Sequence, residues 1–363
     1  MNGNALVPGG AASSAGSNAP RTAASSDTPS GFAGSSDTAS GEGGRNSQLS
    51  GVQAECRAFL GADEIKRLHS ENLALDLLVT FVPLAAAALC FWAVGLPDLP
   101  WAVRIGLSLA IAWLLTLNGL VAHDLCVHRL RWGRTLSWLH SAIAFGLLTS
   151  SGTGYGRTHI RHHAKIGTAE DTEAYKQDLT TVWRRFAFCT LVGIKLVRSG
   201  RWATPRRRGY YDTGERTAVE HRQARFERYF VIATLIAVLA YAWFDPMRAF
   251  MGYIVPLALF APVLNTLRII IEHADTDPSN PYAVGTNYRT GFWGKLFFLA
   301  DSGDCHLVHH VFPRIPCYRM PAAVRALRPL IASKGVPERR SYAALLKGWF
   351  VDGYPHRSHW PLG

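Results

Sequence analysis

The uncharged stretch LLVTFVPLAAAALCFWAVGL, Leu77–Leu96, decides the fold of this chain. Its length matches the roughly 20 apolar residues that an α-helix needs to cross the hydrocarbon core of a bilayer. A second apolar run, Ile105–Ala122, follows after the short, turn-like link PDLP. The two runs together predict a hairpin of membrane-spanning helices.

A second pair of apolar runs lies further along the chain, at Tyr229–Phe244 and Ala249–Leu267. Aromatic residues near the ends of the first of these runs, Tyr229 and Trp243, are typical of the membrane–water interface. The sequence therefore predicts an all-α integral membrane protein with four transmembrane helices in two hairpins.

Two further apolar segments, Leu136–Leu148 and Phe292–Leu299, are too short to cross a membrane. We expect them to belong to a cytoplasmic helical cap over the functional site. There they either lie in the membrane interface or pack as ordinary core helices.

Basic residues are concentrated in one part of the chain. The segment 122–227 carries eighteen Lys and Arg, whereas the two hairpin turns carry only Arg248. The positive-inside rule therefore places this segment and the functional site on the cytoplasmic side, and we expect a multi-pass protein of a bacterial inner membrane. Anionic headgroups account for the net charge of +12, so no nucleic-acid partner is expected.

The chain divides into two parts by composition. Residues 1–55 consist mostly of Gly, Ala, Ser, Thr, Asn and Asp with almost no large apolar side chains, which predicts a disordered low-complexity tail. Residues 56–363 form the second part, one membrane domain with polar inserts. The six cysteines form no CxxC pair, which is typical of free thiols in a reducing compartment.

Nine of the fourteen histidines fall into four short clusters, each just beyond an apolar run. The clusters are HDLCVH with His123 and His128, HIRHH with His159, His162 and His163, IIIEH with His273, and HLVHH with His306, His309 and His310. Imidazole is the commonest metal ligand of proteins, and nine rings exceed what one metal ion coordinates. The clusters therefore predict a membrane enzyme with two metal ions.

The spacing within the clusters bears on how the rings converge. In HIRHH and HLVHH the offsets i, i+3 and i+4 share one helix face, so all three rings of a cluster can point to one site. In HDLCVH the two histidines lie about 140° apart on an ideal helix. Either the helix is distorted there, for example by a π-bulge, or the two rings straddle two metal ions.

The donor types indicate iron. There is no set of thiolates for an iron–sulfur cluster and zinc normally takes four ligands, whereas all-histidine sites of this size suit two irons. Carboxylates near the clusters are candidates to accept the second ring N–H of a ligating histidine. These are Asp124, Glu170, Asp171, Glu173, Glu272, Asp301 and Asp304, of which Glu272, directly before His273, is the strongest.

The motifs HDLCVH, HIRHH and HLVHH resemble the three histidine boxes of the membrane fatty acid desaturase family. The sequence HLVHHVFPRIPCYRMP, His306–Pro321, is similar to the acyl-lipid desaturase pattern after the third box, and the resemblance covers about residues 70–330. It implies that the nine cluster histidines hold a di-iron centre. It also implies that His273 is the ligand outside the boxes, and that Asn265 is a candidate to complete one iron shell through water.

The resemblance further implies the chemistry. Dioxygen is the co-substrate, and the product is a fatty acyl chain, lipid-linked or carrier-linked, with a new double bond. Because no HPGG motif is present, a separate ferredoxin or cytochrome b5 type protein is expected to donate electrons. A related membrane di-iron hydroxylase or ketolase acting on an acyl, alkane or carotenoid substrate is the alternative.

A metal transporter or sensor is a more remote alternative. Transporters tend to place their ligands inside the spans, near the midplane of the membrane. The predicted spans of this chain contain no histidine, which favours an enzyme.

Overall fold

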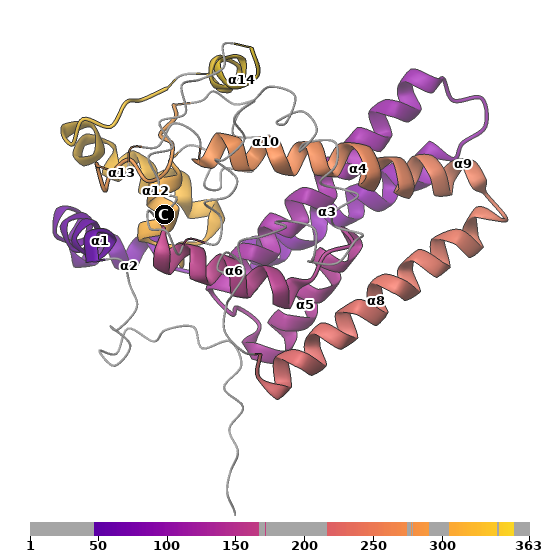
Figure 1. The fold of residues 1–363 in the computed structure, drawn as a ribbon, viewed down its shortest axis with the longest axis horizontal. Coiled ribbons are helices and arrows are strands. Elements are labelled where there is room, and N and C mark those ends of the chain that lie inside the picture. Colours follow the sequence, from indigo (N-terminus) through magenta and orange to yellow (C-terminus); the bar gives the residue numbers. More distant parts are fainter. Residues whose placement is uncertain are drawn as a thin grey trace, which may run out of the picture. The chain divides into compact units, whose positions relative to one another are not determined.

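The structure, a computed structural model, describes residues 47–166, 171, 216–273, 277, 279–289, 305–339 and 341–351 (Figure 1). Over these residues it is all-α, as predicted, and the only strand-like pairings are two isolated bridges. The predicted helix Phe292–Leu299 lies outside the described residues. The elements are α1 (Ser47–Leu60), α2 (Ala62–Leu68), α3 (Leu73–Val94), α4 (Trp101–Ala122), η2 (His123–His128), α5 (Gly133–Leu147), α6 (Gly152–Lys165), α8 (Ala218–Ala242), α9 (Pro246–Ala249), η4 (Phe250–Ile254), η5 (Pro256–Phe260), α10 (Ala261–His273), α12 (His306–Val311), η6 (Cys317–Arg319), α13 (Met320–Ser333) and α14 (Tyr342–Phe350).

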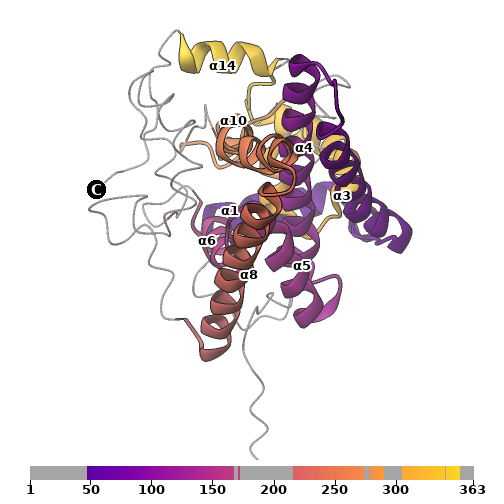
Figure 2. The same ribbon diagram turned by 90° about the vertical axis from the view of Figure 1, so that its right-hand side faces the viewer.

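Three of the described helices are long and apolar enough to cross a membrane, namely Ala62–Val94, Trp101–His128 and Pro246–Asn265. Within the first two, α3 and α4 pack side by side in both views (Figure 1, Figure 2), and the link PDLP forms the turn between them. Large apolar side chains on α3, such as Phe81 and Leu89, are at least 60% exposed, as expected of a surface that faces lipid.

The third of these helices contains unusual turns. After α9, two π-helical stretches, η4 and η5, precede α10, and Pro256 begins η5 without an N–H to donate. Ser108 of α4 donates its hydroxyl to the carbonyl oxygen of Met251 in η4, which satisfies an acceptor in an apolar region. A side chain at Gly252 would collide with Phe91 of α3, so the glycine lets this helix approach α3 closely.

The predicted span Tyr229–Phe244 falls mainly in α8 and is not among the three candidate spans. Charged residues at Arg225, Glu227 and Arg228 precede it within the same helix, which shortens its uncharged part. Its apolar side chains are nevertheless on the surface, with Ile236 60% exposed. The arrangement of four spans in two hairpins therefore stays a prediction.

A further hydrophobic core joins both ends of the described chain. There α1 and α2 pack with α12 and α13, and Leu68, Phe312 and Leu327 are almost fully buried. Helix α1 begins at Ser47, inside the tail predicted to be disordered, so the predicted boundary at residue 55 is too late. The reason is that Val52, at 3% exposure, packs into this core, a tertiary contact that the composition of the tail does not reveal.

A buried ion-pair network ties α3 to the end of α4. The guanidinium of Arg129, just after η2, donates to Asp124 Oδ1 and Oδ2 at 3.0 Å each and to Asp76 Oδ1 of α3 at 2.8 Å. All three side chains are at most 5% exposed. Because buried charges require close partners of opposite sign, the network fixes where η2 lies relative to α3.

Replacing Arg129 by Met leaves the carboxylates of Asp76 and Asp124 buried without their shared partner. Breaking a buried ion pair in this way costs about 3–5 kcal/mol, so we expect a clearly lower midpoint of thermal unfolding in detergent micelles. The matched control is Arg67→Met, which breaks the exposed pair with Glu64 on α2 and is expected to leave the midpoint unchanged. Equal midpoints for the two variants would contradict this role of Arg129.

Candidate metal centre

The first histidine cluster lies on a distorted helix end. Helix α4 continues directly into the π-helical turn η2, which spans His123–His128. Because a π-turn bonds residue i to residue i+5, its first and last side chains lie on the same side. The two ring centroids are 4.6 Å apart and the two Nε2 atoms 2.9 Å apart. The predicted π-bulge is confirmed, and the two rings lie in one group of ligand atoms.

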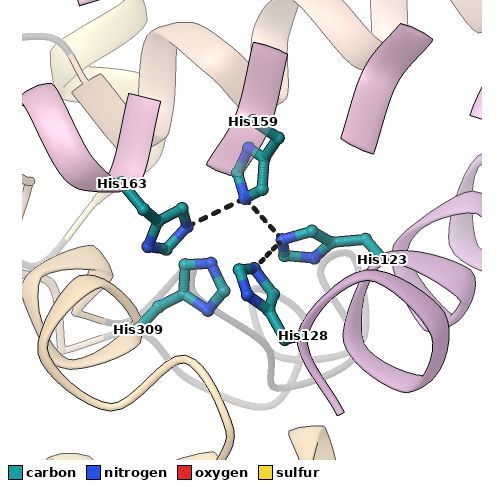
Figure 3. Close-up of side chains that lie close together, drawn as sticks. All are labelled: His123, His128, His159, His163 and His309. Carbon is teal, nitrogen blue, oxygen red and sulfur yellow. Dashed lines mark hydrogen bonds between the residues drawn. The ribbon is translucent and has the colours of Figure 1, made fainter. Parts of the chain in front are cut away.

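Rings from α6 and α12 join the two rings of η2. His159 Nε2 on α6 lies 2.7 Å from His123 Nε2 and 2.8 Å from His163 Nε2. The ring of His309 on α12 has its centroid 4.8 Å from those of His123 and His163. We call these four residues, together with His128, the five-histidine group, and Figure 3 shows their rings facing a common centre. Their candidate ligand atoms all lie within 4.8 Å of one another, so the group could hold a metal ion.

The other four cluster histidines form a second group, with ligand atoms that also lie within 4.8 Å of one another. This four-histidine group consists of His162 from α6, His273 from α10, and His306 and His310 from α12. His306 Nε2 lies 3.0 Å from His273 Nε2. The two groups adjoin, because the ring centroids of His163 and His310 are only 4.3 Å apart. The structure thus brings together all nine histidines predicted to be ligands.

Each HxxHH motif divides its rings between the two groups. On α6, positions i and i+4 enter the five-histidine group and position i+3 enters the four-histidine group. On α12 the division is reversed, since only the ring at i+3 enters the five-histidine group. The three rings of a motif therefore converge on the pair of adjoining groups and not on one of them alone. The physical reason is that i+3 and i+4 lie about 60° and 40° to opposite sides of i on a helix.

Burial favours the neutral form of four of these rings. It lowers their pKa well below the usual 6.5, and neighbouring imidazoles lower it further. The four are His163, His306, His309 and His310. Only a neutral imidazole offers a metal ion a nitrogen lone pair.

Some of the ring nitrogens lack a protein partner. Both nitrogens of His310 and Nε2 of His309 are buried without a hydrogen bond. Buried polar atoms left in this state cost free energy, and a cation between the rings would offset that cost. The donor set therefore fits two metal ions, one in each group.

One carboxylate orients a ring of the four-histidine group. Asp171 Oδ1 lies 2.7 Å from His162 Nδ1, and the two side chains are at most 2% exposed. A carboxylate on one ring nitrogen fixes the tautomer and directs the other nitrogen to the metal. Asp171 was only one of seven acidic candidates in the sequence, and nothing in its neighbourhood singled it out.

Asp124, a predicted partner of a ring, has a different role. Its carboxylate binds Arg129, and its Oδ2 also accepts from the backbone N–H of Cys317 at 3.1 Å. Cys317 lies in the segment that follows the third histidine box. Asp124 therefore connects the first box to the segment behind the third box, which sequence proximity to His123 did not indicate.

The other predicted partners have mixed outcomes. Glu272 Oε1 accepts from Nη1 of Arg268 one turn earlier on α10, at 3.0 Å. Asn265 is half-buried on the same helix, and its role in an iron shell stays a prediction. Asp304 lies outside the described residues.

Sequence reasoning missed an aromatic side chain at the site. The ring of Tyr155 stacks on that of His159, with centroids 5.1 Å apart and planes 9° apart, and also packs against Phe145 of α5. The available signal was the spacing, because residue 155 precedes His159 by four positions and so shares its helix face. The stack restricts the rotation of the His159 ring.

The fold and site define a class: a helical protein with spans apolar enough for a membrane and two adjoining groups of buried histidines. The fatty acid desaturase family profile matches residues 99–342, well over half of the sequence, and the chain belongs to this family. It is therefore a fatty-acid-modifying enzyme of the desaturase or hydroxylase type. Comparison with curated proteins gives no match.

Replacing Asp171 by Ala removes the carboxylate acceptor from His162 Nδ1. Loss of such a partner lowers metal affinity by about 10–100-fold, and we expect that loss for one of the two metal ions. Chelator competition on the purified, Co²⁺-loaded protein measures it. Asp171→Asn, which keeps an acceptor oxygen, is the matched control and should bind more tightly than Asp171→Ala. Two unchanged affinities in Asp171→Ala would show that this contact does not tune the site.

Proposed function

We propose that this enzyme is a dioxygen-dependent di-iron desaturase, which introduces a double bond into a lipid-linked or carrier-linked fatty acyl chain. The observation that carries the proposal is the pair of adjoining all-histidine groups, with five rings and four. Membership of the fatty acid desaturase family supports the same chemistry and the acyl substrate.

Two iron ions are the proposed occupants. The five-histidine group would hold one and the four-histidine group the other. Five imidazoles exceed the tetrahedral set that zinc prefers, and no thiolate belongs to either group. When bound, iron supplies the one-electron redox chemistry with dioxygen that an unactivated CH₂ group requires.

The contribution of the chain itself is burial and orientation. Seven of the nine histidines are at most 6% exposed, which keeps bulk water away from the reacting carbons. Asp171 and Tyr155 restrict the rings of His162 and His159. The remaining task of the protein is to hold one carbon–carbon pair of the acyl chain next to the two groups.

The candidate spans support entry of the acyl chain from the bilayer. The span Trp101–His128 ends at the five-histidine group, and α10, which continues the span Pro246–Asn265, ends at His273 of the four-histidine group. Each group therefore lies at the C-terminal end of an apolar helix. We place them on the cytoplasmic side of a multi-pass protein, with α8 as the fourth span, on the positive-inside rule. A separate ferredoxin or cytochrome b5 type protein is the proposed electron donor.

The reaction is tested by mass spectrometry of lipids from cells that express the wild type or His309→Ala. We expect a product two mass units lighter than its precursor with the wild type alone, because His309 belongs to the five-histidine group. His221→Ala, which alters an exposed histidine outside both groups, is the matched control and should retain the product. A product sixteen mass units heavier would make the enzyme a hydroxylase, and no product from the wild type would refute the proposal.

The metal assignment is tested by the iron content of the purified protein. The neighbours His309 and His310 share α12 but belong to different groups. We expect two irons per chain in the wild type and in His221→Ala, and at least one fewer in His309→Ala and in His310→Ala. Iron contents that do not differ among the four proteins would exclude these residues as ligands.

A further inference from the structure

The side chain of Glu227 is almost fully buried, at 1% exposure, although it precedes the apolar part of α8. Four donors surround its carboxylate. Oε1 accepts from Trp138 Nε1 at 3.0 Å and from the backbone N–H and hydroxyl of Thr153 at 3.0 and 2.6 Å. Oε2 accepts from the hydroxyl of Ser151 at 2.5 Å. This acid was not singled out by the sequence, and the metal chemistry does not use it directly.

The donors place Glu227 at the beginning of α6, the helix that carries HIRHH. Ser151 is the N-cap of α6, and its Oγ accepts from the backbone N–H of Gly154 at 2.9 Å. Thr153 belongs to the first turn, whose N–H groups have no partner within the helix. A carboxylate there pairs with those N–H groups and interacts favourably with the helix dipole. Glu227 therefore caps α6 from another helix, and its bond to Trp138 includes α5 in the same contact.

A second contact between α8 and α6 fixes the relative orientation of the two helices. Glu220, two turns before Glu227 on α8, accepts from Arg157 Nη1 of α6 at 2.6 Å. Figure 2 shows α8 running past α5 and α6. Two contacts at different heights restrain both sliding and rotation of α6, whereas one contact would leave rotation free.

Helix α6 supplies rings to both histidine groups, so the geometry of both groups depends on its position. His159 and His163 belong to the five-histidine group and His162 to the four-histidine group. From Thr153 to His159 the helix rises about 9 Å, a distance over which it behaves as a rigid rod. A shift at its beginning therefore moves all three rings together, and metal sites tolerate only about 0.5 Å of such displacement.

We propose that Glu227 is a positioning residue for the metal centre, which sets the place of three histidine ligands by anchoring the first turn of α6. The inference rests on the proposed function, since it concerns the same two histidine groups. An ionised carboxylate suits the role because it only accepts hydrogen bonds and every group around it donates. A glutamine would retain one acceptor oxygen and turn an NH₂ group toward these donors.

The test compares full-length wild type, Glu227→Ala and Glu227→Gln with Leu115→Ala. Leu115 of α4 packs in a core formed with residues of α3, α5 and η5, none of which belongs to α6, and its truncation destabilises the protein there. For each purified protein the ligand-field absorption of bound Co²⁺, the iron content per folded chain, the thermal midpoint, kcat and KM are measured.

For Glu227→Ala we expect an altered Co²⁺ spectrum, and metal affinity and kcat lowered by about tenfold or more, with KM little changed. Glu227→Gln should lower metal affinity and kcat less than Glu227→Ala does. Leu115→Ala should lower the thermal midpoint and keep the wild-type spectrum. If Glu227→Ala does not fold, the Co²⁺ spectrum and kcat of Glu227→Gln are compared with those of Leu115→Ala, and only Glu227→Gln should differ from the wild type.

Two contrary results have different meanings. If wild type binds two metal ions and the Glu227 variants lower only the thermal midpoint, with wild-type spectrum and kcat, Glu227 is merely structural and the inference is overturned. If wild type itself binds no metal and forms no product, the proposed function fails, and the positioning role fails with it.

Discussion

The structure depends on one constraint: nine imidazole rings have to be held close together, away from water, with their nitrogens facing one another. Such nitrogens are polar, and burying them without partners is unfavourable. The segments that supply the rings come from distant parts of the sequence, at the end of α4, on α6, at the end of α10 and on α12. No single segment could bring these rings together. Each HxxHH motif divides its rings between the two groups, so each group is completed by rings from other segments. The placement of α6 relative to α12, whose rings meet at His163 and His310, is therefore as important to the site as the histidines themselves.

Buried carboxylates hold these segments in place. Asp124 joins the turn η2 to Arg129 and to the backbone of Cys317. Asp171 orients the ring of His162, and Glu227 contacts the beginning of α6. Asp124 acts on η2, whereas Asp171 and Glu227 act on the end and the beginning of α6, and each of the three is nearly inaccessible to solvent. A buried carboxylate is stable only with specific donors around it, so these contacts favour one arrangement of the helices over others.

Much of the architecture could be predicted from the sequence because it depends on local patterns. Long uncharged runs predicted the helices α3 and α4, and the i, i+3, i+4 spacings identified the ring-bearing helices. The 140° separation of His123 and His128 left only a distorted helix or two separate sites, and the π-turn η2 decided between them. The burial of Val52 could not be predicted, because it depends on contacts with residues more than 200 positions later in the sequence. The pairing of Asp171 with His162, nine residues earlier, depends on a tertiary contact that no local pattern marks. The role of helix α8 was harder still to predict from the sequence, because its charged first half contacts α6 while its apolar second half is exposed.

The central claim is that the nine histidines form two separate metal sites, one for each group. Crystals of the iron-loaded protein, measured at the iron absorption edge, test it most directly because anomalous scattering locates iron without reference to activity. The account predicts two anomalous peaks, one inside the five-histidine group and one inside the four-histidine group. A single peak between the groups, or peaks at other residues, would contradict it.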